Sequence, residues 1–394
     1  MQTVSIAVCM SRKRAKTVVN KLIYLDNAAT TKVNPEVLES YNKTKNLYFA
    51  NPGSIHIPGQ EASRLLEKAR EQIINTLCVK DHELVFTSGA TEANNLAIKG
   101  YALKHQNRGK HLITTNIEHP AVLEAFKQLE QYFGFEVTYL PVNKNGVIEI
   151  AELKKAIKKD TILVSIMAVN NEVGSINPLH EIAKLLKTYP LIAFHSDVTQ
   201  GIGKIDLPYN DLDMFSFSGH KIHGLNSSGA LIKRKKIELL PLLSGGGQEN
   251  NLRSGTNDVA LAVSLAKTTR LEISNLNENY RKTVPVSEHL VNYIKSKPEL
   301  YELNSFDNPY IINFSTLTKK ASVVVEALSS RGIMVSSVSA CHAKEEPISY
   351  VVKALGKSDV LAHNTVRVSL SHDTTMEEIK EFIDVLEDII KELK

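Results

Sequence analysis

Apolar positions follow two different periods along this chain, and the two periods alternate. Short apolar runs, typical of buried strands, occur between stretches in which apolar residues recur at helical spacing. The strands predicted in this way are residues 84–87, 111–114, 162–169, 191–194, 214–217 and 229–232. Helical patterns separate them, for example at residues 62–77 and 121–132. The alternation predicts an α/β fold in which helices cover both faces of a mostly parallel sheet.

The pattern changes after about residue 265. Charged helical sequence leads there into apolar runs at 311–314, 333–335 and 365–370, and a final helix begins at Thr374 or Thr375 with a capping-box glutamate three residues later. We therefore expect a large domain over residues 24–265 and a smaller α+β domain over residues 266–394, joined by part of the N-terminal segment.

Residues 1–23 carry a short apolar piece followed by basic residues, the reverse of the order in a secretory signal. We expect a disordered extension there, and an organelle transit peptide is the alternative.

Composition narrows the class of partner. The chain has 394 residues with 47 Lys and Arg against 43 Asp and Glu, and the net charge of +4 is spread without a long run of one sign. This favours small metabolites over nucleic acid or a membrane surface. The cysteines Cys9, Cys78 and Cys341 are too few and too far apart for a disulfide framework or a zinc cluster. We expect a reducing, cytoplasmic location, no metal site, and a core-packing role for Cys78 at the end of a helical stripe.

One lysine follows directly after a predicted buried strand. Residues 214–217 are followed by Ser218, Gly219 and His220, and then by Lys221. Apolar surroundings lower the pKa of an amine and free its lone pair to form a Schiff base with a carbonyl compound. Most lysines are only solvated charges. A catalytic role for Lys221 therefore needs support from polar groups at the ends of the other strands.

Polar groups do follow the other strands. The turn at residues 87–92 is small and polar and opens a helical pattern, so its N–H groups and the Thr91 hydroxyl could cradle a phosphate. An ordinary N-cap by Ser88 or Thr91 is the alternative. Asp197 follows another apolar run, and a buried carboxylate there needs a partner such as a protonated pyridine nitrogen. A metal ligand or a helix cap is the alternative for this aspartate.

Two further strand ends carry an imidazole and an amide. His119 follows the strand at 111–114, and residues 170–174 follow the strand at 162–169. Because the carboxyl ends of parallel strands meet at one edge of a sheet, these groups predict a single small-molecule site there.

Cys341 lies in a segment without an apolar period. Residues 336–347 are small and polar, and His342 and Lys344 are close in sequence. A thiol in such a loop has the access and the positive neighbours that a nucleophilic thiolate needs.

These segments occur in an order that resembles a known family. Residues 24–31, 51–56, 86–92, 117–119, 169–174, 216–222, 245–249, 253–256 and 339–341 together look like the NifS/IscS-type cysteine desulfurases. Those enzymes depend on pyridoxal 5'-phosphate, belong to aminotransferase class V and have fold type I. The resemblance extends from Tyr24 to the final helix.

The resemblance implies a role for each matching residue. Lys221 holds the cofactor covalently, Asp197 pairs with its pyridine nitrogen, and His119 stacks on the ring and helps to move protons. The other implied cofactor contacts are Ala90, Thr91, Ser218, Gly219 and His220 around the phosphate, Gln200 and Asn171 at the ring substituent, and Thr256 reaching the phosphate from the second subunit of a homodimer. Asn171 also contacts the substrate, and Arg367 clamps its carboxylate.

The implied reaction removes sulfur from L-cysteine, leaving L-alanine and a persulfide on Cys341. The sulfur then passes to an acceptor protein for iron–sulfur cluster assembly or for thiolation of tRNA or a cofactor. Selenocysteine lyase, class V aminotransferase and non-catalytic scaffold are the alternatives. Val338, residues 224–227 and Asn250-Asn251 depart from the family pattern, which leaves turnover and partner geometry open.

Overall fold

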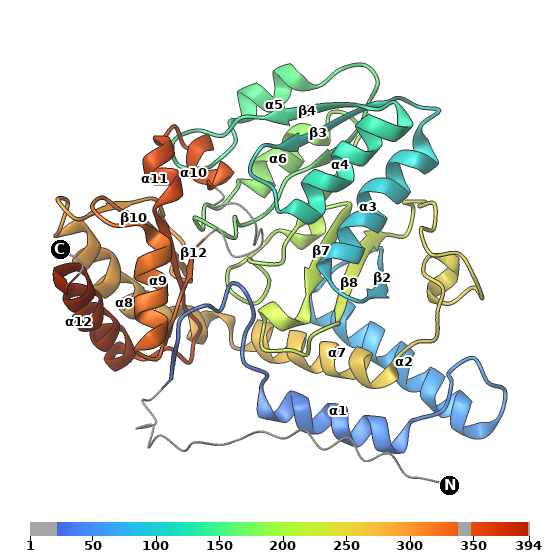
Figure 1. The fold of residues 1–394 in the computed structure, drawn as a ribbon. Helices are drawn as coiled ribbons and strands as arrows, with labels where there is room; N and C mark the ends of the chain where they lie inside the picture. The colour runs from blue at the N-terminus through green and yellow to red at the C-terminus, as the bar shows by residue number, and fades with distance from the viewer. Residues whose placement is uncertain (1–21, 338–347, 393–394) are drawn as a thin grey trace, which may run out of the picture.

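The computed structural model describes residues 22–337 and 348–392 of the chain (Figure 1). Its largest sheet has seven strands in the order β2-β8-β7-β6-β5-β3-β4. These strands are β2 (His82–Thr87), β3 (His111–Thr115), β4 (Glu136–Leu140), β5 (Thr161–Ser165), β6 (Ala193–Asp197), β7 (Met214–Ser218) and β8 (Gly229–Arg234). All neighbouring pairs are parallel except the two that β8 forms with β2 and β7. The predicted mostly parallel sheet is confirmed.

Alternate residues of the central strands enter two different cores. Ile113, Val164 and Phe215 pack in one core, whereas their chain neighbours Leu112, Leu163 and Met214 pack in the other. The first core receives residues from α2 (Ile57–Thr76), α5 (Ile150–Ala156), α6 (Leu179–Leu186) and α7 (Val259–Ser274). The second receives residues from α3 (Ala90–His105) and α4 (Pro120–Phe133). Strands buried on both faces explain the continuous apolar runs in the sequence.

A smaller sheet lies toward the C-terminal end of the chain, in the order β12-β13-β10-β9 (Figure 1). Its strands are β9 (Tyr301–Leu303), β10 (Ile311–Thr316), β12 (Ser336–Ser337) and β13 (Thr365–Ser369), and β1 (Ile23–Tyr24) pairs separately with β11 (Ile333–Met334). Its core includes residues of α8 (Leu276–Lys295), α9 (Ala321–Ser330) and α12 (Met376–Glu392), together with Ile23 and Leu25. The predicted boundary at residue 265 falls inside the continuous helix α7, and the domain limits stay a prediction.

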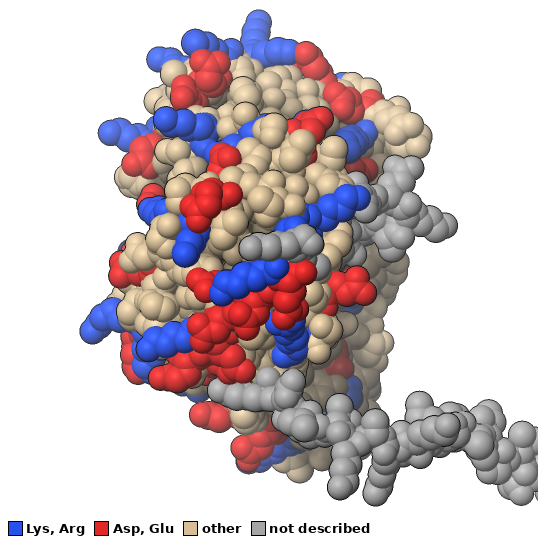
Figure 2. All heavy atoms as spheres, turned by 60° about the vertical axis from the view of Figure 1, so that its left-hand side comes forward, with Lys and Arg blue, Asp and Glu red and all other residues tan. Residues whose placement is uncertain are grey.

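The remaining helices are short or peripheral. They are α1 (Pro35–Leu47), α10 (Tyr350–Ala354), α11 (Asp359–His363) and the 3-10 turns η1 (Tyr209–Asp211), η2 (Gly219–Lys221) and η3 (Glu249–Asn251). Among the described residues, no helix is both long and apolar enough to cross a membrane. Acidic and basic side chains lie side by side over the face shown in Figure 2, in agreement with the mixed charge of the sequence.

Three local predictions are wrong. The strand predicted at 162–169 corresponds to β5, which already ends at Ser165. The strand predicted at 191–194 begins later and runs on through Asp197, because Leu191 is exposed at the surface. Cys78, predicted to pack in the core, is exposed. The helix ends at Thr76, and Cys78 has a φ of 52°, so its side chain no longer follows the helical stripe.

Candidate active site

Ten of the residues singled out from the sequence line one cavity. It has a volume of about 560 Å³, and these residues are Ala90, Thr91, His119, Asn171, Asp197, Gln200, Ser218, His220, Lys221 and Arg367. They come from the ends of the large-sheet strands, the start of α3 and strand β13 of the small sheet. The cavity therefore lies where the two sheets meet.

Two of the other predicted site residues, Gly219 and Thr256, lie outside this cavity. Gly219 is buried beside Lys221, where a Cβ would come within 2.4 Å of Ser228 Oγ, so only glycine fits. Thr256 lines a neighbouring cavity that also includes Ser88 and Ser227. Cys341 lies outside the described residues.

Lys221 is held at the cavity wall by backbone carbonyls. It ends the short turn η2 directly after β7. Its Nζ donates to Ala28 O at 2.8 Å and to Ala29 O at 2.5 Å. The turn therefore presents the amine to the segment at residues 24–31, one of the segments that carry the family resemblance.

Asp197 is a buried carboxylate at the end of β6. Its Oδ2 accepts a hydrogen bond from Asn94 Nδ2 at 2.7 Å, and its Oδ1 accepts one from Thr199 N at 2.9 Å. In the described part of the chain, no Lys, Arg or His side chain forms an ion pair with it. A buried carboxylate without a cation favours a cationic ligand group in the cavity.

The start of α3 is open toward a second hollow of about 370 Å³. Gly89 is the N-cap with a φ of 149°, and neither Ser88 nor Thr91 caps this helix through its side chain, so the predicted alternative of capping by one of them is wrong. Ala90 N donates to Ser218 Oγ at 2.7 Å, and Thr91 and His220 line the same hollow. Free N–H groups at a helix N-terminus and nearby hydroxyls are typical of a phosphate site.

The imidazoles of the cavity are kept neutral by burial. Burial and the nearby Lys221 lower the pKa of His220 to about 4. Burial also lowers the pKa of His119, whose Nδ1 accepts a hydrogen bond from Ala121 N at 3.1 Å and caps α4. Since Nδ1 accepts, the hydrogen of the neutral His119 ring is on Nε2.

Three polar atoms of residues that line the cavity lack partners among the described residues. They are Asn171 Oδ1, Thr199 Oγ1 and Arg367 Nε. The other Arg367 nitrogens are engaged, with Nη1 donating to Asn171 O at 2.9 Å and Nη2 paired with Asp26 Oδ1 at 2.9 Å. Buried polar atoms without partners indicate that a ligand completes this part of the site.

Three polar residues of the site were missed by the sequence reasoning: Asp26, Asn94 and Lys204. Lys204 Nζ donates to Gln200 Oε1 at 2.9 Å, and burial lowers the pKa of Lys204 to about 7. Asn94 carried a usable signal, since it is a polar residue on the buried face of a helix that otherwise packs apolar side chains. Asp26 gave no comparable signal, because it reaches the cavity beside Arg367 only through the tertiary structure. Lys204 lines the smaller neighbouring cavity and touches the site through Gln200, four residues before it.

The cavity thus has a place for each part of pyridoxal phosphate. The open start of α3 with Ser218 and His220 fits the phosphate, and a side chain at Gly89 would approach Ser218 Oγ at 3.2 Å. Asp197 fits the pyridine nitrogen, and Lys221 fits the aldehyde carbon. Fold and site together define an enzyme with a lysine-bound pyridoxal cofactor.

Comparison with known proteins gives the same class. The sequence model of the aminotransferase class V family matches residues 23–382, and the chain belongs to this family. A cysteine desulfurase IscS of Dictyoglomus turgidum is 40% identical over 377 residues, which cover 94% of this chain and 95% of that protein. Enzymes of this kind depend on pyridoxal 5'-phosphate, so the family and the cofactor expected from the sequence are confirmed.

Solved structures agree with this assignment. A NifS-like protein superposes with a TM-score of 0.87 at 35% identity, covering 94% of this chain and all of that one. A structure described as SspA in complex with cysteine superposes with a TM-score of 0.75 at 36% identity, covering 88% of this chain and 98% of that one.

Proposed function

We propose that this protein is a cysteine desulfurase that takes sulfur from L-cysteine, releases L-alanine and leaves a persulfide on Cys341. One observation carries the choice among class V reactions. Ser337 and Ile348, the described residues on either side of the segment that contains Cys341, both line the cavity of Lys221. The described chain on both sides of this cysteine therefore lies at the cavity wall, and an aminotransferase would need no cysteine there.

The residues that hold the cofactor follow from the cavity. Lys221 attaches it, with Asp197 at the ring nitrogen, His119 on the ring face and Gln200 near the ring substituent. Ala90, Thr91, Ser218 and His220 surround the phosphate. When bound, pyridoxal phosphate supplies an electron sink for negative charge at the substrate Cα.

The chain's own groups then have separate tasks. Arg367 orients the substrate carboxylate, and its Nε is a donor that lacks a partner among the described residues. Asn171 Oδ1, an acceptor that also lacks a partner there, takes a hydrogen bond from a donor group of the ligand. The Lys221 amine removes the Cα proton of cysteine, and the neutral His119 holds a hydrogen on Nε2 for transfer during the reaction. Asn94 acts through Asp197, because its hydrogen bond orients that carboxylate.

Cys341 takes the sulfur. Its thiolate attacks the Sγ of the substrate, the bond between Cβ and Sγ of the substrate breaks, and the electron pair of that bond returns to the substrate carbon, which is protonated to give alanine. The new S–S bond makes Cys341 a persulfide, and atoms and electrons balance without a further oxidant.

Several finer features belong to the same proposal. We expect a homodimer in which Thr256 contacts the phosphate bound by the second subunit, since in the described chain Thr256 lies outside the main cavity. The persulfide passes to an acceptor protein of iron–sulfur cluster assembly or of thiolation, and the reaction takes place in the cytoplasm.

The proposal is tested by replacing each cysteine in turn. Cys341→Ser should reduce sulfide and persulfide production from cysteine at least about a thousand-fold, because it removes the nucleophile. Cys78→Ser is the matched control, since Cys78 is an exposed free thiol, and it should keep normal activity. Mass spectrometry of the protein after incubation with cysteine should locate the extra sulfur on Cys341.

Other outcomes select the alternatives. Full amino-group transfer in Cys341→Ser would indicate an aminotransferase, and extra sulfur on Cys78 alone would contradict the site assignment. Turnover of selenocysteine but not of cysteine would indicate a selenocysteine lyase. Failure to bind pyridoxal phosphate would leave only the scaffold interpretation.

A further inference from the structure

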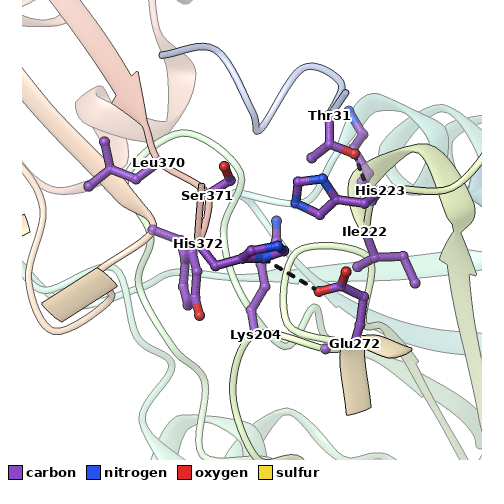
Figure 3. A pocket seen from close by; sticks show the side chains of 11 residues that line it. Thr31, Lys204, Ile222, His223, Glu272, Leu370, Ser371 and His372 are labelled. Atoms are coloured by element: carbon purple, nitrogen blue, oxygen red, sulfur yellow. Dashed lines mark hydrogen bonds and ion pairs between the residues drawn. The ribbon is translucent and has the colours of Figure 1, made fainter. Parts of the chain in front are cut away.

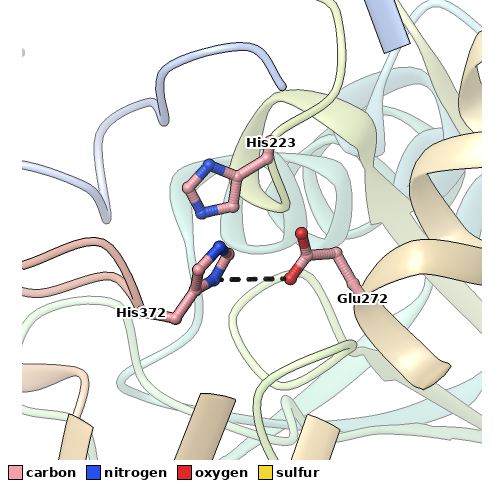
Figure 4. Close-up of side chains that lie close together, drawn as sticks. All are labelled: His223, Glu272 and His372. Carbon is pink, nitrogen blue, oxygen red and sulfur yellow. Dashed lines mark ion pairs between the residues drawn. The ribbon is translucent and has the colours of Figure 1, made fainter. Parts of the chain in front are cut away.

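A second cluster of ligating side chains lines a smaller cavity, which shares only Lys221 with the main cavity. His223, Glu272 and His372 each direct one ligating atom to a common point, and these atoms all lie within 4.8 Å of one another. Figure 4 shows the three side chains turned toward one another. They surround a small cavity of about 10 Å³, enough for a single ion or water.

The His223 ring is fixed in a metal-binding orientation. Its Nδ1 lies 3.0 Å from Lys32 O, and because a carbonyl only accepts, Nδ1 carries the hydrogen. Nε2 is therefore left with its lone pair directed at the cluster. A backbone carbonyl that holds the far nitrogen of a histidine is the usual support for a metal ligand.

The carboxylate and the second histidine face each other without a hydrogen bond. Glu272 is buried on α7, and its Oε2 lies 3.8 Å from His372 Nδ1, too far for such a bond. Within residues 22–337 and 348–392, no group donates a hydrogen bond to the Glu272 carboxylate. The other His372 nitrogen, Nε2, lies 3.6 Å from Asp373 Oδ1, which is also too far for a hydrogen bond. The tautomer with its hydrogen on Nε2 and its lone pair on Nδ1 is therefore open to this ring.

The neighbouring ammonium gives a competing explanation. Burial raises the pKa of Glu272 to about 8, and Lys204, which also lines this small cavity, opposes that rise because its ammonium favours the ionised carboxylate (Figure 3). Lys204 Nζ, however, donates to Gln200 Oε1 at 2.9 Å, and no ion pair between Lys204 and Glu272 is formed in the described structure. Lys204 therefore donates no hydrogen bond to His223, Glu272 or His372 in the described structure, and their lone pairs can bind an ion.

We propose that His223 Nε2, His372 Nδ1 and the Glu272 carboxylate bind one divalent transition-metal ion of the Zn²⁺ class. Two imidazoles and one carboxylate are a ligand set that Zn²⁺ accepts, with a fourth position for water. Metal–ligand bonds of about 2.0–2.2 Å place the ligand atoms of a tetrahedral site roughly 3.5 Å apart. The longest distances between the three ligating atoms, which are within 4.8 Å, therefore shorten by about 1 Å on binding.

The location gives the ion a structural role. His223 is two residues after Lys221, Glu272 is on α7, and His372 follows β13, the strand that carries Arg367. A metal ion here ties the segment of the cofactor lysine to the strand of the substrate-binding arginine. This inference concerns a site outside the main cavity and does not depend on the proposed reaction.

The test uses the full-length holoenzyme with its cysteines blocked by iodoacetamide and its metals removed with a chelator. Titration with ZnCl₂ followed by calorimetry should give one ion per chain, and CoCl₂ should give the visible absorption of tetrahedral Co²⁺. We expect at least tenfold weaker binding in Glu272→Gln and in His372→Ala. Zn²⁺ should raise the melting temperature of the unaltered protein and leave that of the two variants unchanged.

His180→Ala is the matched control. His180 is an exposed histidine paired with Asp211 at 2.7 Å, so its removal should leave Zn²⁺ binding as it was. If His372→Ala does not fold, the nearly isosteric Glu272→Gln decides the result. Failure of the unaltered protein to bind Zn²⁺, or equal binding in Glu272→Gln, would overturn the proposal and favour Lys204 as the partner of Glu272.

Discussion

Single buried groups set the charge around the cofactor cavity, and Glu118 is the clearest case. It is fully buried beside His119, and its Oε1 accepts hydrogen bonds from Met167 N and Thr115 Oγ1, both at 2.9 Å. Its Oε2 has no partner among the described residues, and burial raises the pKa of this carboxyl to about 8. The group is therefore protonated in the folded protein at neutral pH.

This predicts a pH dependence of stability. Between the unfolded pKa of about 4.5 and the folded pKa of about 8, the folded state binds the extra proton, so the free energy of unfolding falls as the pH rises. The contribution of Glu118 reaches about 1.4 kcal/mol per pH unit. In Glu118→Gln this contribution should vanish, which urea unfolding at a series of pH values will measure. Parallel pH profiles for the two proteins would contradict the assignment.

For single residues, the sequence indicated which side chains are candidates for chemistry, but it did not indicate which residues they contact. Lys221 and Asp197 were identified because each polar group directly follows an apolar run, and burial of such groups has few explanations other than a ligand. The pairing of Arg367 with Asp26 was not predictable, since 341 positions separate the two residues along the chain. Cys78 was misplaced because periodicity does not indicate the residue at which a helix ends.

Among the elements, the final helix shows how local signals fix a boundary. Thr375 Oγ1 accepts a hydrogen bond from Glu378 N at 3.2 Å, and Glu378 Oε2 accepts one from Thr375 N at 2.9 Å. This is the capping box expected from the sequence, and it satisfies two N–H groups at the start of α12.

Removing this cap should cost measurable stability. We expect Thr375→Ala to lower the free energy of unfolding by about 0.5–2 kcal/mol, because Glu378 N loses its acceptor. Thr375→Ser keeps the hydroxyl and should remain within about 0.5 kcal/mol of the unaltered protein. Denaturant unfolding compares the three proteins, and equal losses in both variants would mean that methyl packing, not the cap, is responsible.

Other elements lacked such a signal. Strand β4 was not predicted because only Val137 and Leu140 of its five residues are buried, which gives no apolar run. The start of α3 offered Ser88 and Thr91 as caps, yet the helix begins uncapped beside a hollow. A capping residue in the sequence thus predicts the start of a helix only where the first N–H groups of that helix do not face a ligand site.

For the molecule as a whole, one apolar surface remains uncovered. Phe49, Ile55 and Ile57 lie where α1 passes into α2 and are 80%, 92% and 72% exposed. Neighbouring exposed apolar side chains of this size are typical of a protein interface. They agree with the homodimer that we propose from the separate position of Thr256.

The dimer is tested at this surface. The double variant Phe49→Asp and Ile55→Asp should raise the dissociation constant of the dimer at least about 30-fold, since charges would have to be buried in an apolar contact. Val360→Asp is the control, because Val360 is also exposed but lies on α11. Analytical ultracentrifugation measures the change, and an unaltered dimer in the double variant would place the interface elsewhere.

The sequence by itself determined the mostly parallel sheet, the family and the cofactor, and it predicted the lysine that would hold this cofactor. All of these depend on patterns within short segments, because an apolar run or a capping residue acts through its chain neighbours. Only the tertiary structure brought Arg367 to Asp26 and Asn94 to Asp197, and only it brought together His223, Glu272 and His372. Residues so far apart in the chain become neighbours through the packing of two sheets, which no spacing in the sequence records.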